Sequence, residues 1–369
     1  MVRHVLPIYL VSRLCVLAGA AVVAAELRAD QNLAAERMLP TGDPHATTPI
    51  TSATRPMLDV LTSWDGLWYL ELVRSGYPRS VPPDVTYHVE EARAAFFPLF
   101  PLVARIVDRV VPGGDTSAVL LLNAMLGFVV IVLVGLIAQR LYGARVGTRA
   151  ATLTALFPGS FVLSFAYSEA LMLVLAAACL WCLVEREWTA AGVFAALATA
   201  TRPNGIALVA ACVVAALLAI LDRRDWRSLT AVCLGPIGFV VFQLWLGHHT
   251  GEAGVWFRVQ REAWNEGASF GWTAIRNTIE ALSDPLTSPT DTLTALSLAA
   301  LVILVVTSWR ARLDLTLAAY TVGIVVLMLV PATVTARPRF VFTAFPLFVG
   351  AAKWYEDRRS ADGEHWTWL

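Results

Sequence analysis

The sequence predicts an all-α polytopic membrane protein, and three observations support this fold class. Of its 369 residues, 57% are hydrophobic and only 15% are charged, whereas soluble domains average about 45–50% apolar and about 25% charged residues. The apolar residues gather in blocks of roughly 17–23, long enough to cross a hydrocarbon layer about 30 Å thick as helices. The 28 basic and 28 acidic side chains cancel. This composition excludes a soluble enzyme and a nucleic-acid-binding protein with a basic face.

About ten apolar stretches are predicted to span the membrane. Arg13 interrupts the first stretch, which favours a retained helix over a cleaved signal peptide. Residues 95–111 are apolar but contain two prolines and three charged residues, so we expect an interfacial or re-entrant helix there. The predicted spans are residues 5–25, 117–139, 150–166, 168–184, 188–201, 203–221, 229–247, 291–309, 314–332 and 340–355.

Basic residues in the short connections predict the orientation. By the positive-inside rule they mark the cytoplasmic side of the cell membrane, with both termini there. We therefore expect a single membrane domain, 1–369, with two large extracytoplasmic loops at 26–116 and 248–290. Its polar mass lies on the extracytoplasmic face, where we expect the active site. The basic residues that define the inside are Arg3, Arg140, Arg145, Arg149, Arg186, Arg223, Arg224, Arg227, Arg310, Arg312, Lys353, Arg358 and Arg359.

One carboxylate in the first loop lies in an apolar stripe. Residues 58–75 repeat apolar side chains at helical spacing, and Asp65 falls among them. Such a helix would lie on the membrane surface with Trp64 and Tyr69 at headgroup level. Partial loss of water there makes a carboxylate a better proton acceptor. The alternative is an interfacial helix whose Asp65 faces water or caps a neighbour.

Several blocks of the sequence resemble one family. Residues 63–69 (SWDGLWY) and 75–78 (SGYP) resemble the WDxxWY…GYP signature of the PIG-V-type GPI mannosyltransferases. Further blocks follow in that family's order over nearly the whole chain. They are FFPLFPL at 96–102, FP…YSE at 157–169, ATRPNG at 200–205 and RF…FPL at 339–347.

This resemblance implies a GT-C-like membrane glycosyltransferase with interfacial helices in its large first loop. It implies transfer of mannose, with inversion, from a polyprenyl phosphate to a lipid-linked or glycolipid acceptor on the extracytoplasmic face. We expect no cofactor besides this lipid-linked donor. The expected partners are the bilayer, the donor and the acceptor, with a small membrane partner subunit left open and no nucleic acid.

The chemistry of such a transfer suggests roles for particular residues. An inverting displacement needs one base for the acceptor hydroxyl and cations for the departing phosphate. Asp65 is the candidate base. Arg202, Arg337 and Arg339 lie beside prolines in short outer turns, against the usual charge bias, and guanidinium suits bidentate phosphate contact. Snorkelling to lipid headgroups is their alternative role.

Other residues are candidates for substrate binding or for structural roles. Glu169 could orient a sugar hydroxyl, pair with an arginine, or complement a helix dipole. Asn204 could contact sugar or cap the next helix. Arg13 is a functional candidate because charge inside a span is costly, and a structural ion pair is its alternative. Aromatic candidates for substrate contact are Trp64, Trp68 and Tyr69, and Trp256, Trp264 and Trp272 could form a rim or anchor the membrane interface.

No metal site is predicted. His248, His249 and Glu252 could bind an ion, but adjacent histidines point to different sides of a helix, so a divalent metal is not expected. Two other functions are weighed against the enzyme. A lipid or solute transporter would show pseudo-symmetric halves, and a non-catalytic subunit of a mannosyltransferase complex would keep the fold without activity.

Overall fold

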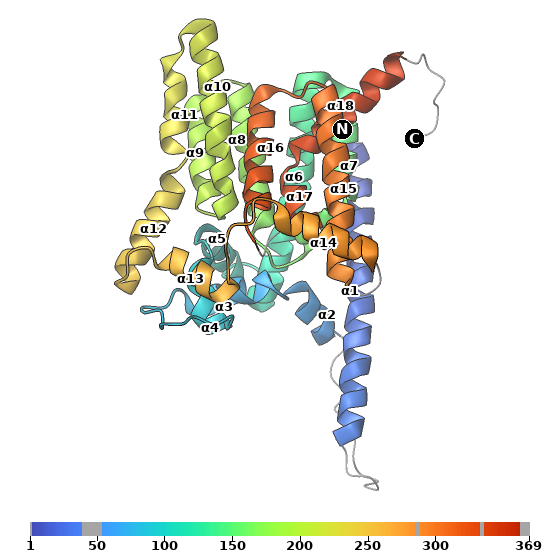
Figure 1. Cartoon of the computed structure of the whole chain (residues 1–369), viewed down its shortest axis with the longest axis vertical. Helices are drawn as coiled ribbons and strands as arrows, with labels where there is room; N and C mark the ends of the chain where they lie inside the picture. Colours follow the sequence, from blue (N-terminus) through green and yellow to red (C-terminus); the bar gives the residue numbers. More distant parts are fainter. Residues whose placement is uncertain (1, 39–53, 285–287, 333–335, 362–369) are drawn as a thin grey trace.

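A computed structural model describes residues 2–38, 54–284, 288–332 and 336–361, which form helices, their connections and one isolated bridge (Figure 1). The helices are α1 (Val2–Met38), α2 (Thr54–Leu61), α3 (Asp65–Ser75), α4 (Val89–Ala92), η1 (Arg93–Ala95), α5 (Leu99–Asp108), α6 (Gly114–Tyr142), α7 (Ala144–Leu156), η2 (Pro158–Ser164), α8 (Glu169–Val184), α9 (Trp188–Thr199), η3 (Pro203–Ile206), α10 (Ala207–Arg223), η4 (Trp226–Ser228), α11 (Leu229–Leu234), α12 (Ile237–Thr250), α13 (Val255–Trp264), α14 (Trp272–Ser283), α15 (Pro289–Arg310), α16 (Leu315–Leu329), α17 (Pro338–Thr343) and α18 (Pro346–Ala361).

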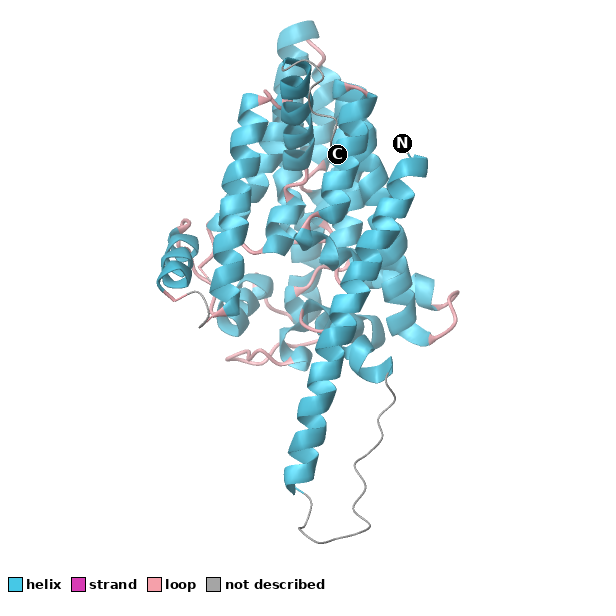
Figure 2. Cartoon of the chain, turned by 90° about the vertical axis from the view of Figure 1, so that its right-hand side faces the viewer, coloured by secondary structure: helices cyan, strands magenta, loops and turns pink. Residues whose placement is uncertain are grey.

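The long helices form a bundle, and the short ones gather at one end of it. Helices α2–α5 and α13 lie towards the lower end of the bundle in the view of Figure 1, with α14 beside the lower half of α15, while the start of α1 and the end of α18 lie towards the other end. Figure 2 shows α1 running along the bundle and extending past it on the side of the short helices. The predicted topology requires the two ends of the chain to lie at the end of the bundle opposite the loop helices, as the start of α1 and the end of α18 do here. Which end faces the cytoplasm stays a prediction.

Five described helices are long and apolar enough to cross a membrane, and a sixth is added if the bent pair η2–α8 is counted. The ten predicted stretches are largely helical, but the count of ten spans stays a prediction. Helix α5 has ten residues, about 15 Å at 1.5 Å per residue, and is too short to cross as a single helix. This length fits the interfacial or re-entrant helix expected within 95–111.

Residues 150–166 do not form the continuous helix that the apolar pattern predicts. Helix α7 ends at Leu156, and η2 is a 3₁₀ helix that begins at Pro158. Proline has no N–H to continue the α-helical hydrogen bonds. Gly159 follows, and a Cβ there would lie 2.1 Å from the carbonyl oxygen of Pro338. This close approach packs η2 directly against α17.

Two apolar cores hold the molecule together. The larger one fills the bundle. The smaller one joins α3 and η1 to α12 and α13 through Trp68, Phe97, Phe242 and Trp256, which are all nine-tenths or more buried. Trp256 Nε1 also donates a hydrogen bond to the Ala95 carbonyl at 2.9 Å. The loop helices are thereby fixed on the end of the bundle as a packed layer.

Arg13 is buried against η2, and among the described residues it forms no ion pair. Its guanidinium donates to the Ser160 carbonyl at 2.6 Å, to Ser160 Oγ at 2.7 Å and to Ser164 Oγ at 3.1 Å. These bonds satisfy an intramembrane charge without a carboxylate. The alternative of a structural ion pair is therefore wrong for the described part of the chain, and Arg13 instead holds the 3₁₀ segment through hydrogen bonds.

Candidate functional site

Asp65 begins a helix instead of lying in the middle of one. The predicted helix over 58–75 is wrong at residues 62–64, where α2 ends and α3 starts. Thr62 Oγ1 and Ser63 Oγ donate to carbonyls of α2 at 2.8 Å, which favours termination there. Trp64 then adopts a positive φ of 57°. Asp65 is the first residue of α3, where the helix dipole favours a negative charge.

The break between η2 and α8 lies directly against this helix start. The two helices meet at an angle of 107°, and the N–H of Ala166 in the break donates to the Leu61 carbonyl at 2.9 Å. Tyr69 of α3 and Ser168 share a hydrogen bond of 2.5 Å. Glu169 follows as the first residue of α8 and is 1% exposed.

Arg202 lies between these two helix starts. It precedes Pro203 in an extended conformation, and its side chain is 11% exposed. Its Nη1 donates to Glu169 Oε2 and to Ser168 Oγ, each at 2.9 Å, and lies 3.7 Å from Asp65 Oδ2. Burial alone would lower the pKa of Arg202, but the negative charges of Glu169 and Asp65 outweigh it and raise the pKa.

Arg339 reaches Asp65 from α17. Its Nη1 lies 3.1 Å from Asp65 Oδ2, and its guanidinium lies over the rings of Tyr167 and Phe340, at 5.5 and 4.6 Å from the ring centres. Burial would lower the pKa of Arg339, but Asp65 and Glu169 outweigh it and raise the pKa. We call Asp65, Glu169, Arg202 and Arg339 the ion cluster. Its two positive and two negative charges cancel.

Arg337 carries no ion pair among the described residues. Its pKa is lowered by partial burial and by the neighbouring charge of Arg339. Arg337 thus lies near Arg339 without a carboxylate partner, but it is not among the residues that line the cavity beside the ion cluster.

The remaining predicted residues differ in their access to the cluster. Trp64 is 64% exposed and Trp68 is 2% exposed. The Trp68 ring packs with those of Tyr87, Phe96 and Trp264 at centre distances of 4.7–5.7 Å. Burial raises the pKa of Tyr69, so its hydroxyl keeps its proton beside Ser168. Ser168 itself was not predicted as a site residue; its only sequence signal is its place in the YSE block.

Asn204 faces a cavity and does not cap a helix. No side-chain cap bond is present at the start of η3 or α10, and the Asn204 side chain makes no hydrogen bond within the described ranges. The capping alternative is therefore wrong, because Ile206 takes the position before α10.

A cavity of about 430 Å³ opens beside the ion cluster. We call it the central cavity. One wall carries Asp65, Arg202, Asn204 and Arg339, and the other is made largely by α13. Trp256 and Trp264 lie in this second wall as a rim, whereas Trp272 is not part of the lining. The further residues of α13 that line the cavity, which the sequence did not single out, are Phe257, Gln260 and Arg261.

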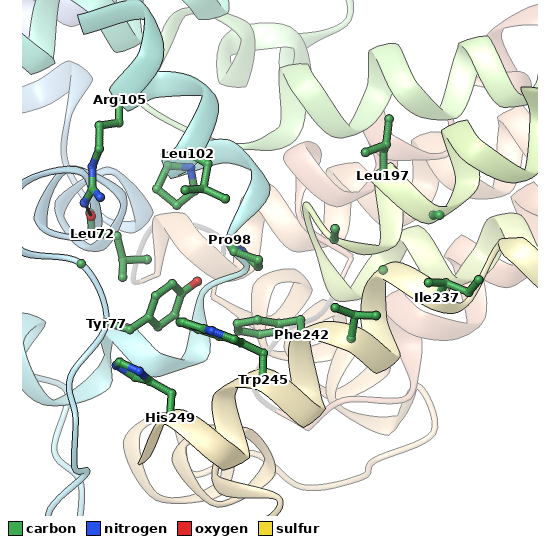
Figure 3. A pocket seen from close by; sticks show the side chains of 16 residues that line it. Leu72, Tyr77, Pro98, Leu102, Arg105, Leu197, Ile237, Phe242, Trp245 and His249 are labelled. Carbon is green, nitrogen blue, oxygen red and sulfur yellow. Dashed lines mark hydrogen bonds between the residues drawn. The ribbon is translucent and has the colours of Figure 1, made fainter. Parts of the chain in front are cut away.

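A second cavity of about 700 Å³ lies between α5, α9 and α12. We call it the apolar groove, since its lining is almost wholly apolar (Figure 3). Leu102, Val241 and Trp245 in this lining are 42–56% exposed. Two segments separate the groove from the central cavity: residues 97–101 and the end of α9. A hydrogen bond from the Leu99 N–H to the Ala200 carbonyl, at 3.1 Å, joins these two segments. Ala200, in the lining of the groove, is two residues before Arg202, which lines the central cavity.

The described residues contain no group of three His, Cys, Asp or Glu side chains that could hold a metal ion. Glu252 forms an ion pair with Arg258, with Oε2 2.6 Å from Nη2, and the His249 ring stacks on the Trp245 ring. Glu252 and His249, two of the side chains considered for a metal site, thus have other neighbours.

Comparisons with known proteins agree with this architecture. A family model described as dolichyl-phosphate-mannose-protein mannosyltransferase matches residues 94–248, less than half of the chain. Among solved structures, the fold is similar to that of ArnT from Cupriavidus metallidurans in the apo state, with a TM-score of 0.52 and 18% identity over 80% of this chain and 55% of that one. The same protein bound to undecaprenyl phosphate gives a TM-score of 0.51 and 17% identity over 79% and 54%. No curated protein matches the sequence.

These comparisons bear on the fold. The chain spans about half the length of the ArnT structures, and at this identity the likeness concerns architecture alone. The prediction of a mostly helical architecture with several apolar helices is confirmed, and the fold is similar to that of ArnT. The matched residues 94–248 include Arg202 but neither Asp65 nor Arg339.

Proposed function

We propose that this chain is a membrane glycosyltransferase that moves mannose from a polyprenyl phosphate to a hydroxyl of a lipid-linked or glycolipid acceptor. The observation that carries the proposal is the meeting of Asp65, Arg202 and Arg339, from three distant segments, at one cavity. The choice of mannose, and of the extracytoplasmic face, follows the PIG-V-type resemblance and the charge bias of the loops.

The ion cluster suits an inverting displacement. The acceptor hydroxyl gives its proton to Asp65 while its oxygen forms a bond to C1 of the sugar from the side opposite the phosphate. The C1–O bond to phosphate breaks, and its electron pair leaves on the phosphate oxygen, so the anomeric configuration inverts. The charge that grows on the phosphate is met by Arg202, Arg337 and Arg339.

The contact between Asp65 and Arg339 is compatible with both roles. A guanidinium has five N–H donors, so Arg339 can hold a phosphate oxygen while it keeps one bond to Asp65. Arg202 is engaged by Glu169 and Ser168, which fixes its direction before substrate arrives. Pre-oriented donors of this kind cost little reorganisation when charge develops.

The apolar groove suits the hydrocarbon tail of the donor. It is open at Leu102 and Val241, and its lining residue Ala200 is two residues before Arg202, so we place the phosphate of a lipid lying in it at the Ala200 end, on the side of the ion cluster. ArnT, a similar fold, has been solved bound to undecaprenyl phosphate. A polyprenyl tail is therefore the occupant that we propose for the groove.

The acceptor is proposed to lie against α13. This wall of the central cavity combines the Trp264 ring with Gln260 and Arg261, and Arg261 has no ion pair among the described residues. An aromatic face with amide and guanidinium donors suits a hydroxylated headgroup. On the same side, Leu327 and Met328 offer apolar contact to a lipid chain.

Transfer of label tests the function. Membranes or purified protein are given polyprenyl-phosphate mannose with a labelled sugar and a total lipid extract. We expect labelled glycolipid with the wild-type chain and none with Asp65→Asn. Asp115→Asn is the matched control, because Asp115 pairs with Arg74 on the same side and outside both cavities. The proposal is wrong if the wild-type chain transfers no sugar, or if Asp65→Asn transfers it at a near-normal rate.

A further inference from the structure

Asn123 is a buried polar side chain in the middle of an apolar span. It lies on α6, a helix long and apolar enough to cross a membrane, and it is 0% exposed. Its Nδ2 donates to the carbonyl of Phe165 at 2.5 Å and to the carbonyl of Tyr167 at 2.7 Å. Both carbonyls belong to the break between η2 and α8, where no regular helical bonds run.

The side-chain type suits this place. A nitrogen with two N–H groups can donate to two neighbouring carbonyls at once, and an asparagine amide carries such a nitrogen on a short, uncharged side chain. Buried carbonyls in a break need partners, since water does not reach them. A leucine of similar size would remove both bonds: the Phe165 carbonyl would keep its bond from the Tyr167 N–H at 2.8 Å, and the Tyr167 carbonyl would lose its Asn123 donor.

Residues 167–169, at the end of this break, contact both arginines of the ion cluster. The Tyr167 ring lies under the guanidinium of Arg339. Ser168 and Glu169 accept hydrogen bonds from Arg202. The direction of this segment therefore sets where the two guanidiniums lie relative to Asp65.

We propose that Asn123 is a positioning residue: its amide fixes the η2–α8 break, and through Tyr167, Ser168 and Glu169 it holds Arg202 and Arg339 at the ion cluster. The inference rests on the proposed function for its activity readout. Asn123 touches neither cavity. Its effect on turnover must therefore pass through the segment that it anchors.

A double-mutant cycle with Glu169 tests this, because residues that act through one another are not additive. Sugar transfer is compared for Asn123→Leu, Glu169→Gln and the double variant. We expect each single change to lower kcat/KM at least tenfold and the double variant to be within about threefold of the worse single one. A double variant whose loss equals the product of the two single losses would overturn the proposal, since Asn123 would then act independently of Glu169.

The controls separate positioning from loss of fold. Thr321→Val removes another buried hydrogen bond, to the Leu317 carbonyl on α16, and is expected to keep near-wild-type activity. Asn123→Ser keeps a polar side chain but has one donor on a shorter stem in place of two, so we expect an intermediate loss. If Asn123→Leu does not purify as a folded protein, the cycle is run with Asn123→Ser and judged by the same criterion.

Failure of the proposed function gives a different result. If the wild-type chain transfers no sugar, hydrogen exchange decides the inference without turnover. Faster exchange of the amides of 166–169 in Asn123→Ser, with α6 unchanged, supports the anchoring role. Exchange equal to that of the wild type in this segment overturns it.

Discussion

Replacing Gly159 by alanine tests whether the placing of Arg339 beside Asp65 sets the rate. An added Cβ would lie 2.1 Å from the carbonyl oxygen of Pro338, about 1.3 Å short of the 3.4 Å at which ordinary contact begins. The η2 and α17 backbones must separate by a distance of that order. Because Arg339 Nη1 lies 3.1 Å from Asp65 Oδ2, such a shift moves the pair towards or beyond the roughly 4 Å limit of an ion pair.

The expected loss follows from that displacement. A misplacement of about 1 Å can cost about 10²-fold in rate, and overpacking costs about 1–3 kcal/mol of stability. We expect Gly159→Ala to purify as a folded protein with kcat for sugar transfer about 10²-fold lower. Gly19→Ala is the matched control, because an added Cβ on α1 meets nothing within 4 Å. A folded Gly159→Ala variant with wild-type kcat would refute the reasoning.

Two further predictions concern the apolar groove and the α13 wall. Leu197→Trp should fill part of the groove, so we expect a several-fold higher KM for a polyprenyl donor with kcat unchanged. A donor with a very short isoprenoid chain should be little affected. Equal effects on both donors would contradict the assignment of the groove to the tail. Hydrogen bonds from Arg258 lower the pKa of Glu252 in the folded protein. The stability that this pair contributes is therefore fully present above the pKa of an unfolded glutamate, about 4.3. It is lost as the pH falls through the lower pKa of Glu252 in the folded protein. Proteolysis near α13 should accelerate over that range in the wild type, and in Arg258→Met it should already be fast at neutral pH; a pH-independent rate in the wild type would argue against the pair.

Much of the helical framework could be predicted from local pattern. Apolar runs longer than a membrane is thick have few other solutions, which is why the stretches around α6, α10 and α15 coincide with long helices. The positions where helices break could not be predicted in this way. Residues 58–75 and 150–166 look continuous in hydropathy, yet side-chain hydrogen bonds at Thr62 and the missing N–H of Pro158 end the helices there.

The candidate site was partly accessible in the same way. Arg202 and Arg339 could be found because they lie in short turns that the charge bias predicts to be outer and poor in basic residues, and Asp65 because a carboxylate in an apolar stripe is unusual. Asn123 could not be found, since a single asparagine in an apolar span has many uses. Its role depends on which carbonyls lie opposite it, and that depends on how α6 packs against the η2–α8 break.

The amino-acid sequence by itself determined the apolar, membrane-spanning character of this chain and the kinds of charged group in its connecting turns, because both follow from composition and spacing along the chain. Only the tertiary structure decided that the two carboxylates and two guanidiniums are mutually paired, and that α13 faces them across a cavity. Pairing depends on distances between segments far apart in the chain, and these are set by the packing of helices and by the few hydrogen bonds that hold their breaks.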